Sequence, residues 1–133
     1  MIRAVVDTNV FVSGVFWKGP PYQVLQAWSE GRFKLIATAP ILDEYERVLT
    51  ELSAKYQFGN SMRILEPVRL NAELVTPVRF AKPVCRDRDD DKFLAGALAG
   101  SAPFLVSGDL DLQAVDGFKG IRVLKARAFL SEL

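Results

Sequence analysis

The stretch Ile2-Arg3-Ala4-Val5-Val6-Asp7-Thr8-Asn9 opens the chain with a short apolar run that ends at an acidic residue. An apolar run without period-two alternation is typical of a strand covered on both faces, as in a parallel sheet between two layers of helices. The carboxyl edge of such a sheet holds the ligand crevice, so Asp7 is a candidate site residue. The alternative is that Asp7 or Thr8 only caps a helix that begins near Asn9.

Four more runs share this character, and helix-like or mixed sequence follows each of them except the last. Together with the first run they predict five strands, at residues 2–6, 34–38, 72–75, 104–107 and 121–124. The repeated order of strand and helix indicates an α/β sandwich. Apolar spacing and capping residues predict helices near Asn9, from Pro20-Pro21 to Gly31, from Pro40 to as far as Phe58, from Asn60-Ser61 with a kink or break at Pro67, after Asp90, and over residues 126–133.

The composition limits the chemistry that the chain can perform. It has 133 residues, 50% hydrophobic and 25% charged, which is typical of one folded domain over residues 1–133. It contains no histidine, and Cys85 is its only cysteine. These absences exclude serine-histidine and cysteine-histidine catalytic triads, histidine-held or four-cysteine zinc sites, and internal disulfides. Any bound metal ion must therefore have oxygen ligands.

Charge and hydropathy give no indication of a membrane or of non-specific DNA binding. The formal net charge is only +1. The N-terminus reaches Asp7 before any apolar run is long enough for an export signal. The longest uncharged stretch, residues 93–108, is shorter than the ~20 apolar residues of a spanning helix. We therefore expect a soluble, cytoplasmic protein that makes no contact with membranes.

Two further acidic regions lie later in the chain. Ser107-Gly108-Asp109-Leu110-Asp111 continues from the fourth predicted strand, and Asp109 or Asp111 can turn back toward the crevice, so one of these acids converges with Asp7 if the first and fourth strands are neighbours. Asp91 aligns with the apolar face of the following helix on a helical wheel, which predicts that its side chain points inward. We interpret the preceding acids as a solvated helix start favoured by the helix dipole; they are Asp87, Asp89 and Asp90.

A fourth acidic position lies in the helix predicted from Pro40. Asp43 lies opposite the apolar stripe of that helix, and we interpret it as solvated. Glu44 and Glu46 lie on opposite borders of the stripe, so helical periodicity leaves both of them open. Each of these residues, taken alone, is compatible with a solvated helix face.

Several carboxylates brought within a few ångströms repel one another unless a cation neutralises them. Oxygen ligands without nitrogen or sulfur suit Mg²⁺ or Mn²⁺, and Mg²⁺ commonly completes its coordination with water and substrate phosphates. Such an ion can activate water and stabilise charge on a phosphodiester. Because the chain has no histidine, the ion must supply most of that activation, with a carboxylate assisting.

Four motifs in this order resemble those of the PIN-domain nucleases, and most closely the small prokaryotic PIN toxins of toxin–antitoxin pairs. They are Val5-Val6-Asp7-Thr8-Asn9, Glu44 in a mid-chain helix, Asp90-Asp91-Lys92-Phe93-Leu94-Ala95, and Val106-Ser107-Gly108-Asp109-Leu110-Asp111-Leu112. The resemblance implies a three-layer α/β/α fold with a five-stranded parallel sheet. It also implies Mg²⁺- or Mn²⁺-dependent cleavage of single-stranded RNA, a homodimer, and a cognate antitoxin protein that restrains the nuclease.

The resemblance also assigns roles to individual residues. By position, the catalytic and metal-binding acids fall on Asp7, Glu44, Asp91 and Asp109, with Asp111 as a weaker fifth ligand. The supporting polar positions are Thr8, Asn9 and Ser107. Basic residues near these acids are candidates for phosphate contacts, which position a strand without reading its sequence; they are Lys18, Arg86, Arg88 and Lys92.

Three other functions fit part of the pattern. Phosphotransferases with an aspartyl nucleophile usually carry a second Asp where this chain has Asn9. A receiver-type signalling domain agrees with Ser107 and Lys125, but Val75-Thr76-Pro77-Val78 after the third predicted strand offers no phosphoacceptor. An inactive PIN fold that serves as an interaction module is the third, and the retention of all four acid positions argues against it.

Overall fold

The computed structural model describes residues 1–57, 59 and 61–133. Its centre is a five-stranded sheet in the order β3-β2-β1-β4-β5, in which every pair of neighbours is parallel. The strands are β1 (Arg3–Val6), β2 (Lys34–Ala37), β3 (Glu73–Leu74), β4 (Phe104–Val106) and β5 (Arg122–Leu124). The predicted five-stranded parallel sheet is therefore confirmed, and each strand is one or two residues shorter than its apolar run.

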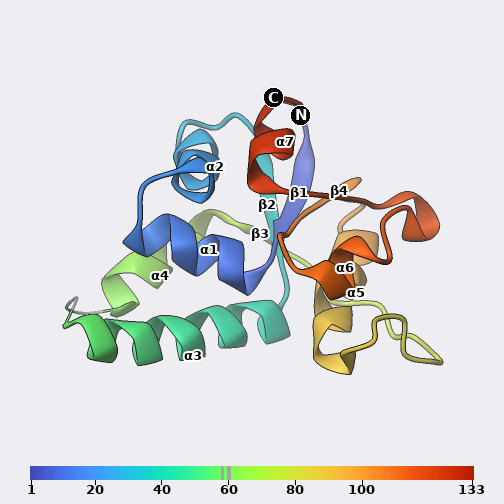
Figure 1. Cartoon of the computed structure of the whole chain (residues 1–133), viewed down its shortest axis with the longest axis horizontal. Helices are drawn as coiled ribbons and strands as arrows, with labels where there is room; N and C mark the ends of the chain where they lie inside the picture. Colours follow the sequence, from blue (N-terminus) through green and yellow to red (C-terminus); the bar gives the residue numbers. More distant parts are fainter. Residues whose placement is uncertain (58, 60) are drawn as a thin grey trace.

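Over the described residues, seven α-helices and two short 3₁₀ segments connect and cover the strands (Figure 1). The α-helices are α1 (Thr8–Phe16), α2 (Pro20–Ser29), α3 (Ala39–Tyr56), α4 (Ser61–Asn71), α5 (Asp91–Ala99), α6 (Leu110–Gln113) and α7 (Ala126–Leu130). The 3₁₀ segments are η1 (Arg88–Asp90) and η2 (Phe118–Gly120). In Figure 1, α1, α2 and α4 lie on one side of the strands, and α5 and α6 lie on the other. This is the α/β/α arrangement that the sequence predicted.

Small residues let α5 lie directly on the sheet. A Cβ atom added at Gly100 would come within 2.4 Å of Ile36 Cγ2, and one at Gly96 within 3.0 Å of Ile41 Cδ1. A Cβ contact as short as that at Gly100 does not occur without movement of the neighbour, and the contact at Gly96 would be tight. The packing of α5 thereby fixes where its first turn stands relative to the ends of β1 and β4.

The structure refines two helix predictions. Of the predicted kink or break at Pro67, the break does not occur: α4 continues through Pro67, and Leu65 and Val68 on either side of it are buried in the core. The last helix ends at Leu130, before the predicted end at residue 133. The predicted end of the long helix near Phe58 and the predicted cap at Asn60 lie outside the described residues, and α3 ends at Tyr56.

Tyr45 ties α3 to the first strand in the core. It is fully buried, its ring stacks on Phe11 with 4.2 Å between centroids, and its hydroxyl donates a hydrogen bond to the carbonyl oxygen of Val6. This contact holds the third helix against the carboxyl end of β1.

Within the described part of the chain, no helix combines the length and apolar character needed to cross a membrane.

Candidate metal centre

The acidic residues meet where β1 and β4 end. These strands are neighbours in register, with Val6 opposite Val106, so the residues that follow them leave the sheet side by side. Asp7 is only 3% exposed and caps α1 by accepting a hydrogen bond from the Val10 backbone N–H at 2.8 Å. The first and fourth strands are therefore adjacent, which is the arrangement under which the sequence predicts that the acids at their ends converge.

Ser107 connects the two strand ends. Its hydroxyl donates a hydrogen bond to the second carboxylate oxygen of Asp7, and it accepts one from the Asp109 backbone N–H at 3.0 Å. Ser107 is fully buried. It therefore fixes the orientation of Asp7 and of the turn that carries Asp109, which is the supporting position expected for it.

Asp7 lies within electrostatic reach of two more acids. Burial raises the pKa of its carboxyl to about 6, and the charges of Asp109 and Glu44 raise it further, against the opposing hydrogen bonds from Ser107 and Val10. A carboxyl held in this way resists ionisation because its charge is both poorly solvated and close to like charges. A cation at this position would relieve both effects.

Asp109 also belongs to a group of three acids. One carboxylate oxygen each from Asp90, Asp109 and Asp111 lie within 4.8 Å of one another. Asp109 holds the turn by accepting a hydrogen bond from the Asp111 backbone N–H at 2.8 Å. Burial raises the pKa of Asp90 to about 7, with further contributions from the charges of Asp109, Asp87, Asp89 and Asp111.

Asp91 is held by the backbone of the loop that precedes η1. Its two carboxylate oxygens accept hydrogen bonds from the backbone N–H groups of Val84 and Cys85, at 3.0 and 2.8 Å. The inward orientation predicted for Asp91 thus leads to a loop and not to the other acids. The acid that lies close to Asp109 and Asp111 is its neighbour Asp90, which we interpreted as solvated from the sequence.

The position of Asp90 depends on the turn that precedes α5. Asp87 accepts a hydrogen bond from the Asp89 backbone N–H at 3.0 Å and starts the 3₁₀ segment η1, which ends at Asp90. A helical wheel drawn with 3.6 residues per turn does not describe a 3₁₀ turn. The local signal for this geometry was Asp87 itself, since Asp residues commonly cap the backbone two residues ahead.

The structure separates Glu44 from Glu46. Glu44 accepts a hydrogen bond from the Thr8 hydroxyl and pairs with Lys92 at 2.7 Å between Oε1 and Nζ. Glu46 instead pairs with Arg69 on α4 at 2.9 Å. Glu44 therefore belongs to the acidic centre, with Thr8 as its support, and Glu46 contributes to helix packing.

The remaining predicted residues lie at different distances from the acids. Asn9 is exposed and lines a hollow of about 280 Å³ together with Asp109. Arg86 pairs with Asp111 at 3.2 Å, although its side chain is 87% exposed. Arg88 is exposed in η1, and Lys18 lies beyond the far end of α1, away from the strand ends. Of the four predicted basic residues, only Lys92 and Arg86 contact the acids.

The donor set fits a hard divalent cation. Asp7, Asp90, Asp109 and Asp111 offer only carboxylate oxygens, and two of these groups have raised pKa values that a cation would lower. Oxygen ligands of this kind suit Mg²⁺ or Mn²⁺. Hydrogen-bonded carboxylate oxygens keep a second lone pair for coordination.

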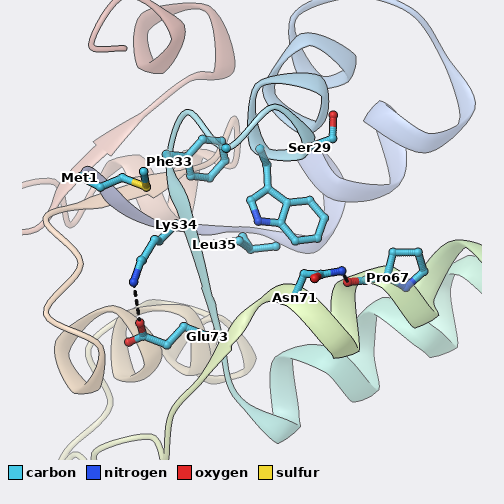
Figure 2. Close-up of a pocket in the computed structure, with 10 residues that line it drawn as sticks. Met1, Ser29, Phe33, Lys34, Leu35, Pro67, Asn71 and Glu73 are labelled. Atoms are coloured by element: carbon cyan, nitrogen blue, oxygen red, sulfur yellow. Dashed lines mark hydrogen bonds and ion pairs between the residues drawn. The ribbon is translucent and has the colours of Figure 1, made fainter.

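Another cavity lies away from the acids. It has a volume of about 530 Å³ and lies at the amino edge of the sheet (Figure 2). Its walls include Trp28, Phe33 and Leu35, and Glu73 pairs there with Lys34 at 3.9 Å. The hollows beside the acidic centre are smaller and more open, about 340 Å³ around Glu44 and Lys92 and about 280 Å³ around Asp109.

Fold and site together define an α/β protein with an acidic centre at the carboxyl edge of a parallel sheet. The family model described as PIN domain matches residues 3–111, and the chain belongs to the PIN domain family. PIN domains are generally nucleases and generally use a divalent metal ion.

Two individual proteins are similar to this chain. The uncharacterized protein MJ1680 of Methanocaldococcus jannaschii is 32% identical over 115 residues, which are 84% of this chain and 73% of that protein. A chain in the crystal structure of VapBC2 from Rickettsia felis, bound to a DNA fragment from their promoter, superposes with a TM-score of 0.58. It is 16% identical, and the match covers 93% of this chain and 98% of that one. The structural likeness supports the fold.

Proposed function

We propose that this protein is an endoribonuclease that cleaves single-stranded RNA with the help of Mg²⁺ or Mn²⁺. The observation that carries the proposal is the approach of Asp90, Asp109 and Asp111 to within 4.8 Å, with buried Asp7 beside them, in a chain of the PIN domain family. The absence of histidine supports a mechanism in which carboxylates and a metal ion share the work of activating water.

The ligands that we propose are Asp90, Asp109 and Asp111, with Asp7 at the floor of the centre. When bound, a divalent cation lowers the pKa of a coordinated water and neutralises charge on the phosphodiester. The protein's own contribution is orientation: Ser107 and the Val10 N–H hold Asp7 in one rotamer. Asp91, which the family resemblance suggested as a ligand, acts in this proposal by fixing the loop before η1.

The substrate would lie across an open surface. The hollows beside the acids are shallow, and their rims carry Asn9 on one side and Arg47 with Lys92 on the other. Amide and basic side chains in such places position a phosphate backbone without reading the base sequence. Arg86, which is almost fully exposed beside Asp111, is a further phosphate contact in this proposal.

We propose further that the protein is the toxin of a toxin–antitoxin pair. The structural likeness to VapBC2 of Rickettsia felis supports this assignment, together with the small size of the chain. On this proposal the protein is cytoplasmic, forms a homodimer, and is held inactive by a cognate antitoxin protein. Light scattering of the purified protein tests the dimer, and a strictly monomeric species would refute it.

The enzymatic proposal is tested with purified protein and a labelled single-stranded RNA. Cleavage is expected with Mg²⁺ or Mn²⁺ and is expected to stop with EDTA. Asp109→Asn should abolish cleavage, whereas Glu66→Gln on the exposed side of α4, which lines neither hollow beside the acids, serves as a control and should not. Cleavage that survives exhaustive chelation would refute the mechanism, and folded wild-type protein that binds no metal ion would refute the proposed centre.

Expression without the partner should arrest growth, and normal growth with soluble, active protein would refute the toxin assignment.

A further inference from the structure

Two aromatic side chains are exposed side by side at the far ends of α1 and α3. Trp17 is 51% exposed and Tyr56 is 48% exposed. Their ring centroids lie 5.8 Å apart, and Phe16 contacts both rings, at 5.8 Å from Trp17 and 6.1 Å from Tyr56. We call these three residues the aromatic cluster. Single exposed apolar residues are ordinary on a protein surface, whereas a contiguous exposed patch is typical of an interaction site.

The rings of the aromatic cluster are supported but not covered. Trp17 and Tyr56 meet at an interplanar angle of 85°, so the edge of one ring lies against the face of the other. This contact covers a face of only one of the two rings. Phe16 packs against the core and supports both exposed rings. Aromatic rings held in this way are suited to stacking with another planar ring.

Positive charge accompanies the aromatic cluster. Lys18 follows Trp17 directly and is exposed. Lys55 lies in the last turn of α3, and its Nζ atom is 5.4 Å from the centroid of the Tyr56 ring. Exposed rings beside lysines match a ligand in which planar groups alternate with negative charges. Single-stranded nucleic acids have this chemistry, because their bases stack on aromatic side chains while their phosphates contact basic ones.

Helix α1 connects the aromatic cluster to the acidic centre. Asp7 caps the first turn of α1 and Trp17 follows its last residue, a rise of about 15 Å along the helix. The hollow of about 280 Å³ beside Asp109 extends along this helix past Asn9 to Ser13. The Ser13 carbonyl oxygen accepts a hydrogen bond from the Trp17 backbone N–H at 3.0 Å, so the hollow ends one turn before the cluster. In Figure 1, α1 and α3 run side by side from the strand ends toward the same side of the molecule.

We infer that the aromatic cluster is a base-stacking site for single-stranded RNA, in which a nucleobase stacks on Trp17 and nearby phosphates contact Lys18 and Lys55. This inference rests on the proposed ribonuclease function, since the strand held at the cluster is the one whose backbone reaches the acids along α1. Stacking is tolerant of sequence because every base has a π face. The cluster therefore adds affinity for unpaired bases without selecting among them.

The inference is tested by measuring RNA binding in EDTA, where cleavage is not expected. Two probes of equal length are compared: a single-stranded oligoadenylate and the corresponding abasic ribose-phosphate oligomer. Trp17→Ala is expected to weaken oligoadenylate binding by at least about tenfold, which corresponds to about 1.4 kcal/mol, and to leave binding of the abasic oligomer nearly unchanged. Lys18→Met should weaken both probes alike, because phosphate contacts do not depend on the base. Leu70→Ala, at a 74% exposed apolar side chain of α4, is the matched control and should bind both probes as the wild type does.

A second measurement leaves the aromatic cluster intact, which keeps the test informative if Trp17→Ala does not fold. The chain has two tryptophans, and the other one, Trp28, lines the cavity at the amino edge of the sheet. The fluorescence of Trp28→Phe therefore reports Trp17 alone, and we expect oligoadenylate to quench it and the abasic oligomer not to. In Trp17→Phe, which reports Trp28 alone, neither probe should quench. Oligoadenylate that binds Trp28→Phe without quenching its fluorescence would overturn the inference.

The outcomes separate the inference from the function on which it rests. If the wild type neither binds nor cleaves single-stranded RNA, both fail. If it binds oligoadenylate with quenching of Trp17 but cleaves no RNA with Mg²⁺ or Mn²⁺, the stacking site is supported and the nuclease proposal fails. If it cleaves RNA and Trp17→Ala binds both probes as the wild type does, or loses affinity for both equally, the function stands and base stacking is refuted. Unchanged RNA binding by Trp17→Ala together with a changed oligomeric state in light scattering would make the cluster an interface between protein chains, which also refutes the inference.

Discussion

Asp90 and Asp91 are adjacent in sequence, yet the structure gives opposite expectations for their replacement by asparagine. Asp91 holds two backbone N–H groups with its two carboxylate oxygens. Asparagine has one oxygen to accept with, so its NH₂ group would face the second N–H in Asp91→Asn. A hydrogen bond to a charged group contributes about 1.5–3 kcal/mol, so we expect this variant to lose about 2 kcal/mol of unfolding free energy.

Asp90→Asn removes a carboxylate whose ionised form destabilises the folded protein. A carboxyl pKa moved from about 4 to about 7 corresponds to at most about 4 kcal/mol. Because the Asp90 side chain is partly exposed, solvent screening reduces the expected effect to about 1–2 kcal/mol. The wild type loses this stability as the pH rises through the folded-state pKa, and the asparagine variant does not. Asp90→Asn should therefore match the wild type near pH 4 and be more stable than it at pH 7 and above without metal.

Thermal melts in EDTA, repeated with Mn²⁺, measure both expectations. For a domain of this size, 2 kcal/mol corresponds to a decrease in Tm of about 6–10 °C for Asp91→Asn. That variant should keep its stabilisation by Mn²⁺, whereas Asp90→Asn should lose most of it, since an ion stabilises only the state that binds it. Glu66→Gln on the exposed side of α4 is the control and should behave as the wild type.

The thiol of Cys85 provides a local readout of the same loop. Burial, together with the hydrogen bond and charge of Asp91, raises the pKa of Cys85 to about 12, so the native thiol should resist alkylation. We expect faster alkylation in Asp91→Asn than in Asp90→Asn, because only the former releases the backbone of the loop. If Asp91→Asn melts like the wild type and loses its response to Mn²⁺ while Asp90→Asn keeps it, the assignment of these two residues is reversed.

Three further expectations follow from the fold and its charges. Without metal, the wild type should lose the stability contributed by Asp7 and Asp90 as the pH rises from about 4 to 7. The raised pKa values of these two carboxyls let the folded state bind more protons than the unfolded state in this range. A constant or increasing Tm between pH 5 and 7 would contradict this. Gly100→Ala should cost about 1–3 kcal/mol by chemical denaturation, since its Cβ would meet Ile36 at 2.4 Å, and Gly108→Ala, with nothing within 4 Å, is the control that should change little. Tyr45→Phe should cost about 1–2 kcal/mol by the same measurement, because it removes a buried hydrogen bond to the end of β1; an unchanged midpoint would show that this bond contributes nothing.

The sequence alone determined the class of fold and the chemistry available to it. Apolar runs without alternation predicted the parallel strands, because residues buried on both faces of a sheet leave no period-two pattern. The absence of histidine and the single cysteine restricted any metal ion to oxygen ligands. Asp7 and Asp109 were identified from their positions at strand ends, since the carboxyl ends of parallel strands lie at one edge.

The tertiary structure decided which of several neighbouring acids face one another. Helical periodicity left Glu44 and Glu46 open, and the choice follows from what each meets: Thr8 and Lys92 in one case, Arg69 of another helix in the other. These partners are distant in sequence, so no local pattern reports them.

The pair Asp90 and Asp91 illustrates the same limit within one turn. The 3₁₀ segment η1 changes the rotation per residue just before α5, and the loop at Val84 supplies N–H groups that attract Asp91. A regular helical wheel assumes one rotation per residue and no competing partners. The direction of each of these carboxylates was therefore fixed only when the loop, the 3₁₀ turn and the ends of β1 and β4 were packed together.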